Sequence, residues 1–206
     1  MQHDPATGEP IVLGIDPGMR VCGWGVVRGG SQGGYVACGA IKPRIKDTFA
    51  QRLLVLHQGI EKLIEDYAPT EVAIEDPFVG ALQPASALAI GQARAAAVIA
   101  AAAAGLEVEF YAPAAVKAAV SGYGQGDKRQ VQAMVRMLLA LEALPEPLDA
   151  ADALAVAICH LNSRRARALE RAARRGSSNR TTRNGRAGSS GCRPSCIAIW
   201  SGRTTP

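Results

Sequence analysis

Residues 11–27 read IVLGIDPGMRVCGWGVV, two short apolar runs on either side of a Pro-Gly pair. Ile11–Asp16 ends at this turn signal, and Val21–Val27 resumes with residues that favour β-strands. The pattern predicts a β-hairpin at the start of the fold. It also places a carboxylate at the end of the first strand, in a stretch whose apolar character otherwise predicts burial.

A third strand, a long helix and a fourth strand are expected next along the chain. The Gly-rich segment 29–34 predicts a turn into an antiparallel strand over Tyr35–Ile41. From Asp47, a candidate N-cap, apolar residues recur at spacings of three and four as far as Tyr67, which predicts an amphipathic helix. A proline ends that helix, and Val72–Glu75 predicts a strand that again finishes on a carboxylate.

The second half of the chain alternates between helical and extended patterns. We expect a fifth strand over Leu106–Tyr111, a helix N-cap at Asp127, and helices over 85–104, 113–120, 127–141 and 149–169. This order places a three-stranded meander beside strands that are joined by right-handed helical crossovers. The sequence therefore predicts an α/β fold with a mixed five-stranded sheet flanked by helices.

One domain of ordinary size accounts for most of the 206 residues. We expect a loose N-terminus over 1–10, one domain over 11–169, and a basic, disordered C-terminal tail over 170–206. Residues 163–206 hold 11 Lys and Arg but a single acid, whereas residues 1–162 hold 12 basic and 17 acidic residues. The net charge of +5 therefore comes from the tail and says little about the domain.

Composition also disfavours several classes of protein. No uninterrupted run of eighteen apolar residues occurs, and the first ten residues lack the basic start and apolar stretch of a secretory signal. Five scattered cysteines, an odd number, argue against a disulfide framework. These features predict a cytoplasmic protein with reduced thiols.

Four carboxylates form the candidate site. Asp16 and Glu75 end two of the expected strands, while Asp149 and Asp152 open the last helix and share one helical face. If the two strands are parallel neighbours, all four acids converge, and such a cluster repels itself unless cations fill it. Each acid also has a simpler interpretation, for example Asp16 as a turn former and Asp149 as an N-cap.

The donor set of this cluster indicates the kind of metal and reaction. Oxygen ligands without a supporting histidine cluster favour Mg²⁺, with Mn²⁺ as a substitute, over zinc. Two such ions, roughly 3.5–4 Å apart, would clamp the attacking water and the leaving oxygen of a phosphoryl displacement. The sequence thus predicts a metal-dependent phosphodiester hydrolase.

Four blocks of sequence resemble the RuvC family of junction resolvases over residues 11–162. The blocks are GIDPGMRVCGWG at 14–25, AIEDPF at 73–78, the segment from Val116 to Leu139, and DAADALAVAICH at 149–160. The resemblance implies a ribonuclease H-like fold and a Mg²⁺-dependent endonuclease that resolves Holliday junctions in DNA recombination and repair. It further implies a homodimer that nicks two strands symmetrically, leaving 5′-phosphate and 3′-hydroxyl ends, and a RuvA/RuvB-type branch-migration complex as a partner.

The resemblance also assigns roles to individual residues. The catalytic, metal-binding acids would be Asp16, Glu75, Asp149 and Asp152, and the DNA-binding residues would be Phe78, Gln83, Arg94, Lys117 and Lys128. Phe78 would stack on a base near the junction centre, a contact of about 1–3 kcal/mol, although core packing fits equally well. The two lysines also fit an ordinary solvated helix face, and Gln83 stands where family members often carry asparagine.

Three other functions fit parts of the sequence. The GIDPG turn resembles the phosphate loop of actin-like ATPases, but that class needs a second domain, for which 206 residues leave no room. A noncatalytic junction-binding or regulatory protein would not need all four acids. A ribonuclease H-like nuclease for another substrate is disfavoured by the segment Lys117–Leu139. The Ala-rich helix 85–104 fits either a dimer contact or a buried core helix.

Overall fold

The computed structural model describes residues 8–31, 33–76, 84–121 and 127–181. The chain divides into two units, residues 1–167 and 168–206. Its elements, in chain order, are β1 (Ile11–Asp16), β2 (Cys22–Arg28), β3 (Gly34–Ile41), α1 (Phe49–Tyr67), β4 (Glu71–Glu75), α2 (Pro84–Ala103), β5 (Val108–Tyr111), α3 (Pro113–Ser121), α4 (Lys128–Leu138) and α5 (Leu148–Thr181). Each expected strand and helix is present among the described residues.

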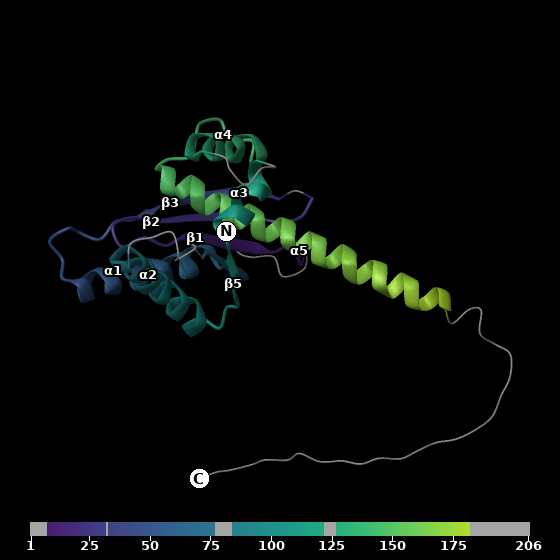
Figure 1. Cartoon of the computed structure of the whole chain (residues 1–206), viewed down its shortest axis with the longest axis horizontal. Coiled ribbons are helices and arrows are strands. Elements are labelled where there is room, and N and C mark those ends of the chain that lie inside the picture. Colours follow the sequence, from purple (N-terminus) through teal and green to yellow (C-terminus); the bar gives the residue numbers. More distant parts are fainter. Residues whose placement is uncertain (1–7, 32, 77–83, 122–126, 182–206) are drawn as a thin grey trace, which may run out of the picture. The chain divides into compact units, whose positions relative to one another are not determined.

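The five strands form one mixed sheet in the order β3-β2-β1-β4-β5. The first three strands are antiparallel neighbours, as the hairpin and meander predicted, and β4 and β5 join in parallel. Helices flank both faces of this sheet (Figure 1). The predicted mixed five-stranded topology is therefore confirmed.

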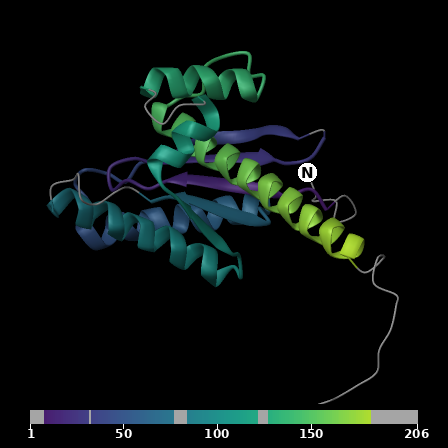
Figure 2. The ribbon, with the colours of Figure 1, turned by 45° about the vertical axis from the view of Figure 1, so that its right-hand side comes forward.

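Side-chain alternation assigns each face of the sheet to a different set of helices. Leu13, Ile15 and Ile74 face the core under α1 and α2, whereas Val12 and Ala73 face the second core under α3, α4 and the start of α5. Figure 2 shows these two helical layers with the sheet between them. Large rings are scarce in both cores, which Ala, Val, Leu and Ile fill instead.

Several boundaries differ from those expected. α1 is capped by Thr48 rather than by Asp47, because Thr48 and Gln51 form a reciprocal capping box. The expected cap at Asp127 is confirmed, and it is a capping box with Gln130. α5 begins at Leu148 and continues to Thr181, so residues 170–181 are helical rather than part of a disordered tail. The rest of that tail lies outside the described residues.

Candidate active site

Asp16 and Glu75 end two strands that are parallel neighbours. The register of β1 and β4 pairs Gly14 with Ala73 and Ile15 with Ile74, so the next residue on each strand is one of the two acids. Both acids fall on the same face as Val12 and Ala73, which is the face that α5 covers. The sheet therefore brings the two carboxyls together at one end and turns them towards the same helix.

Glycines let the first turns of α5 lie directly on this end of the sheet. A Cβ atom on Gly23 would stand 2.0 Å from the Asp149 carbonyl oxygen, and one on Gly14 would stand 2.2 Å from the Ala153 carbonyl oxygen. No side chain larger than hydrogen fits between strand and helix at these points. The two strand glycines thus set the height at which α5 presents its acids above the sheet.

The electrostatics of the site show that three of the four acids interact. Burial raises the pKa of the Asp16 carboxyl from its ordinary 3.8 to about 8, and the charge of Glu75, a hydrogen bond with it, and the charge of Asp152 add to the rise. Burial also raises the pKa of Glu75, with a further contribution from Asp152. In the absence of a cation, Asp16 therefore holds a proton at neutral pH.

Two lysines flank these acids, and both were predicted to contact DNA. The Nζ atom of Lys128, at the start of α4, lies 2.9 Å from Oδ2 of Asp152. The charge of Lys117, on α3, lowers the pKa of Glu75 and so opposes the effect of burial. Both cations therefore act on the acidic site itself, which an ordinary solvated helix face would not require.

Asp149, the fourth acid, acts electrostatically on two neighbouring side chains. It lies in the first turn of α5 rather than at the N-cap, and its charge raises the pKa of Cys22 and of Lys128. Among the residues that the structure describes, no three His, Cys, Asp or Glu side chains form a complete metal-binding group. Electrostatic interactions link Asp16, Glu75 and Asp152, and the convergence of all four acids on a cation stays a prediction.

The chemistry of the paired acids suits a divalent cation. Asp16 and Glu75 are partly buried and share a hydrogen bond, the charge of Glu75 opposes ionisation of Asp16, and all of their donor atoms are carboxylate oxygens. A bound divalent cation relieves such repulsion, and oxygen donors are those that magnesium and manganese prefer. Asp152 is a candidate further ligand, because its charge acts on both acids, and it forms an ion pair with Lys128.

This site makes the stability of the metal-free protein depend on pH. A carboxyl whose pKa is about 8 in the folded state but 3.8 when exposed keeps a proton that the unfolded chain has released, so its contribution to stability falls as pH rises across that window. In EDTA, the melting temperature of Asp16→Asn should exceed that of the natural protein by a margin that widens as pH approaches 8. Differential scanning fluorimetry across this range measures the margin, and a constant or shrinking margin would contradict the assignment.

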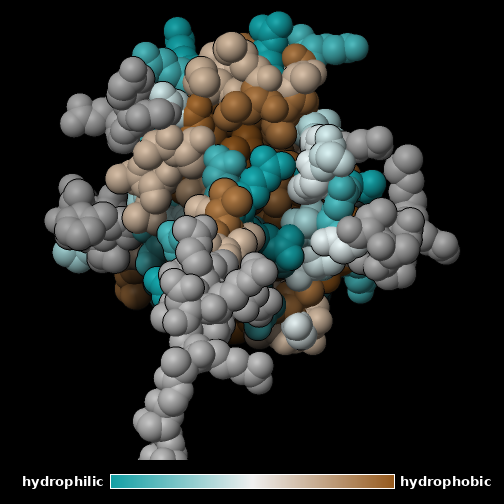
Figure 3. Space-filling view, turned by 90° about the vertical axis from the view of Figure 1, so that its right-hand side faces the viewer, coloured by the Kyte–Doolittle hydropathy of each residue, from teal (hydrophilic) through white to brown (hydrophobic). Residues whose placement is uncertain are grey.

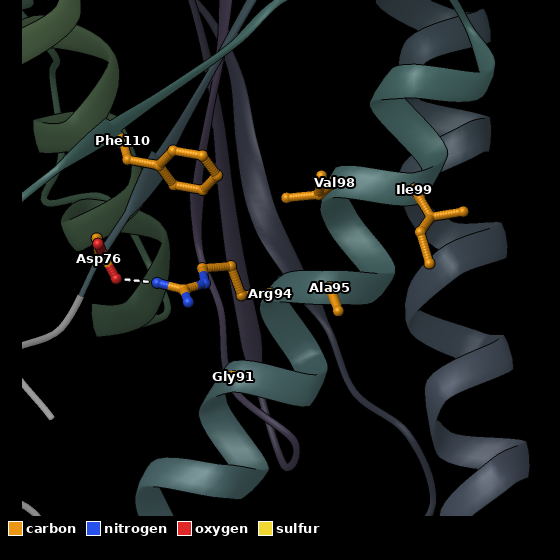
Figure 4. A pocket seen from close by; sticks show the side chains of 7 residues that line it. All are labelled: Asp76, Gly91, Arg94, Ala95, Val98, Ile99 and Phe110. Atoms are coloured by element: carbon orange, nitrogen blue, oxygen red, sulfur yellow. Dashed lines mark hydrogen bonds and ion pairs between the residues drawn. The ribbon is translucent and has the colours of Figure 1, made fainter.

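Arg94 has an intramolecular partner. It lies on α2, forms an ion pair with Asp76, the residue after Glu75, and stacks over the ring of Phe110 at 5.6 Å. These three residues line a shallow pocket of about 390 Å³ with Gly91, Ala95, Val98 and Ile99 (Figure 4). The predicted DNA contact of Arg94 stays a prediction, and those of Phe78 and Gln83 fall outside the described residues.

A hydrogen-bonded network fastens α5 to β4 and β5. The ring of buried His160 lies 3.0 Å from the Tyr111 hydroxyl through Nδ1 and 2.5 Å from Oε2 of Glu71 through Nε2. Arg164 joins Glu71 through its Nε atom at 3.2 Å. In the view of Figure 3, the described surface mixes hydrophilic and hydrophobic residues. His160 thus helps to hold α5 against β4 and β5.

The sequence interpretation missed the role of the strand glycines. Glycine inside a strand pattern signals a close approach of another backbone, and Gly14, Gly23 and Gly25 carried that signal. The structure shows that the backbone close to these glycines belongs to the start of α5. Asp76 and Phe110 were also missed, because neither stands in a pattern that points to a site.

Comparisons with known proteins place this geometry in context. A family model described as crossover junction endodeoxyribonuclease RuvC matches residues 12–160. The protein of that name from Azorhizobium caulinodans is 45% identical over 163 residues, which cover 79% of this chain and 95% of the relative. The one from Rubrobacter xylanophilus is 48% identical over 158 residues, covering 76% and 88%.

Solved structures share the arrangement of the sheet and helices. Thermus thermophilus RuvC in complex with a Holliday junction substrate superposes with a TM-score of 0.68 at 34% identity, covering 73% of this chain and 92% of that one. A yeast mitochondrial Holliday junction resolvase, 14% identical with a TM-score of 0.55, shares the fold. These likenesses confirm the predicted ribonuclease H-like fold.

Proposed function

The chain belongs to the RuvC family of crossover junction endodeoxyribonucleases, and from this premise we propose that it cuts four-way DNA junctions at the end of the sheet that carries Asp16 and Glu75. The observation that carries the assignment is the hydrogen-bonded pair of partly buried carboxyls on adjacent parallel strands, which the charge of Asp152 also affects. Resolution of Holliday junctions in DNA recombination and repair is the function that this family membership supports.

The nuclease is metal-dependent, and we propose Mg²⁺, replaceable by Mn²⁺, with two ions in each site. Asp16, Glu75 and Asp152 would hold the ions, with Asp149 as a further ligand from the first turn of α5. When bound, the ions activate the attacking water and stabilise the charge that develops on the scissile phosphate. The chain itself supplies the orientation, because two ligands lie on strands and two on the docked helix.

Lys128 and Lys117 complete the proposed chemistry of the site. Lys128 now pairs with Asp152, and Lys117 acts on Glu75, so each contributes positive charge where a phosphodiester must approach four acids. Positive groups fixed at such a point favour the approach and the negatively charged transition state. Hydrolysis would leave a 5′-phosphate and a 3′-hydroxyl.

Cleavage of a synthetic four-way junction tests this function. Purified protein should introduce paired, symmetric nicks in a junction with a mobile core when Mg²⁺ is present, and none in EDTA. Linear duplex and an RNA–DNA hybrid serve as substrate controls and should remain intact. Tight junction binding without nicks under either metal would instead favour the noncatalytic alternative.

We further propose that the chain acts as a homodimer through the outer face of α2. Leu88, Gly91, Ala95, Ile99 and Ala102 recur at spacings of three and four, and Leu88 and Ile99 are 63% and 58% exposed. A Cβ atom on Gly91 would meet nothing within 4 Å, so the surface is open there to an approaching ridge. Exposed Phe110 extends this face beside the pocket of Figure 4.

The same helix is long and apolar enough to span a membrane by length and composition, and 28% of its most apolar window is buried. Small residues at helical spacing suit close contact between two helices. Arg94, near the middle of α2, forms an ion pair with Asp76, and a charged residue at this place suits a protein contact better than a lipid one. A second copy of the chain is therefore the occupant that we favour.

Ile99→Glu should weaken the dimer at least about tenfold, because an unpaired carboxylate would be buried in the contact. Sedimentation velocity over a range of protein concentrations measures this effect. Leu54→Glu is the matched control, since Leu54 is 53% exposed on α1 and should leave the dimer unchanged. An unaltered monomer–dimer equilibrium in Ile99→Glu would rule out this face.

Two further proposals rest on family membership alone. They are a cytoplasmic location and association with a branch-migration complex of the RuvA/RuvB type. Neither follows from any contact within the described residues, and a pull-down with purified components would test the second.

A further inference from the structure

A short basic loop follows β3 at the acidic end of the sheet. β3 ends at Ile41, which pairs with Cys22, and Asp16 pairs with Gly23, so the three strands reach this end together. Residues 42–48 then connect β3 to α1. Figure 1 shows this connection between β3 and α1 on the same side of the view as the start of α5.

The loop carries three cations that point into solvent. Lys42, Arg44 and Lys46 are all exposed, and Arg20, in the neighbouring connection between β1 and β2, is exposed as well. Within the residues that the structure describes, no carboxylate forms a salt bridge with any of the four. They stand out because residues 1–162 carry a net negative charge.

Local hydrogen bonds hold the loop in this position. The Asp47 amide donates to the Arg44 carbonyl at 3.1 Å, and the Arg44 amide donates to Oδ2 of Asp47 at 3.1 Å. Pro43 is buried, whereas Ile45 at the tip is 95% exposed. The turn therefore anchors its backbone and leaves the charged side chains free for a ligand.

A second contact joins the two basic connections. The Arg52 guanidinium, on the first turn of α1, donates a hydrogen bond to the carbonyl of Met19, the residue before Arg20. Because the start of α1 continues from the basic loop, this bond keeps Arg20 on the same side as the loop cations. The backbone next to Arg20 is thus tied to the helix into which the basic loop leads.

We propose that Arg20, Lys42, Arg44 and Lys46 form a second phosphate-binding surface, which holds the backbone of a junction arm as it leaves the acidic site. Neighbouring strands lie about 4.8 Å apart, so Ile41 stands roughly 10 Å across the sheet from Asp16. Phosphates of one DNA strand follow each other about every 3.4 Å along the helix axis, so an arm that reaches Asp16 passes the loop within a few nucleotides.

This surface lies on the other side of the acids from the lysines of α3 and α4. Lys117 and Lys128 flank the site from helices that cover one face of the sheet, whereas the basic loop leads to α1 on the opposite face. A backbone that crosses the acids would thus meet fixed positive charge on both sides. The inference rests on the proposed function, because the ligand is the junction that the acidic site cuts.

The salt dependence of junction binding tests this inference. The triple variant Lys42→Gln/Arg44→Gln/Lys46→Gln and the single variant Arg44→Gln are titrated against a four-way junction in EDTA, at several salt concentrations. Each lost phosphate contact should lower the slope of log affinity against log salt by about 0.9, so the triple variant should lose roughly 2–3 and bind at least tenfold more weakly at low salt. The decrease in slope for the single variant should be about one third of the decrease for the triple variant.

Arg28→Gln is the matched control. Arg28 is an exposed arginine at the other end of β2, and its loss should leave the slope unchanged. If the loop variants kept the slope of the natural protein, the inference would be wrong, and an acidic protein would become the alternative ligand of the loop. An equal loss in Arg28→Gln would overturn it as well, because the effect would then reflect overall charge.

Measurements on the natural protein distinguish a failure of this inference from a failure of the proposed function. If the natural protein neither binds nor cuts junctions, the proposed function fails first. If it cuts them while the loop variants bind with an unaltered slope, only the phosphate-binding surface is wrong. Melting temperatures of all variants confirm that exposed substitutions leave the fold intact.

Discussion

Asp16→Asn should abolish cutting of a four-way junction while leaving junction binding in EDTA close to that of the natural protein. The substitution keeps the shape of the side chain but removes the charge that would hold a cation beside Glu75. A group that acts on the transition state and not on the bound substrate lowers kcat without weakening binding. We expect a loss of roughly three orders of magnitude, the upper range for removal of one electrostatic group at a reacting centre.

Gel shift in EDTA and cleavage in Mg²⁺, measured on the same junction, separate the two effects. The variant should also melt at a higher temperature without metal, because asparagine, unlike the Asp16 carboxyl, needs no proton to stay neutral in this partly buried position. Even about 1 kcal/mol of stabilisation corresponds to roughly 2–4 °C in a chain of this size. Loss of junction binding in Asp16→Asn would make this residue structural rather than catalytic.

Gly23→Ala should impair cleavage about a hundredfold although Gly23 carries no functional group. Its new Cβ would stand 2.0 Å from the carbonyl oxygen and 2.5 Å from the carbonyl carbon of Asp149, and backbone atoms cannot rotate away. The start of α5 must shift, and a misplacement of about 1 Å in a catalytic group can cost a hundredfold in rate. Overpacking should also cost about 1–3 kcal/mol of folding free energy.

Two other glycines calibrate this prediction. A Cβ on Gly34, at the start of β3, would meet nothing within 4 Å, so Gly34→Ala should match the natural protein in both rate and melting temperature. Gly25→Ala should fall between the two, because its nearest contact at 2.7 Å is Cδ2 of Leu154, a side-chain atom. If the folded Gly23→Ala variant cleaved at the natural rate, the close packing of α5 on the sheet would not be needed to position the acids of the site.

The parts of the fold that follow local periodicity could be predicted from the sequence. Alternating and continuous apolar runs marked the strands, and the spacing of apolar residues marked α1. Exact ends were less predictable, because Asp47 and Thr48 are both good caps and only the reciprocal bonds with Gln51 decide between them. The length of α5 was underestimated, because the segment after Leu169 lacks the periodic apolar residues that signal a packed helix.

The candidate site was predictable to the extent that topology dictates it. Two acids at the ends of neighbouring parallel strands must meet, and that inference needed only the element order. The pairing of Lys128 with Asp152 depends on how two helices dock. No pattern in the sequence carries that information, and for the same reason the sequence could not choose between a dimer contact and a core helix for α2.

Mn²⁺ binding, followed by electron paramagnetic resonance, tests most directly whether the acidic end of the sheet is the metal-dependent active site. The natural protein should bind about two ions per protomer, the number expected of a two-metal nuclease. The double variant Asp16→Asn/Glu75→Gln should lose this binding while its far-ultraviolet circular dichroism and junction affinity in EDTA stay unchanged. Undiminished Mn²⁺ binding by the folded double variant would contradict the account and place the metal elsewhere.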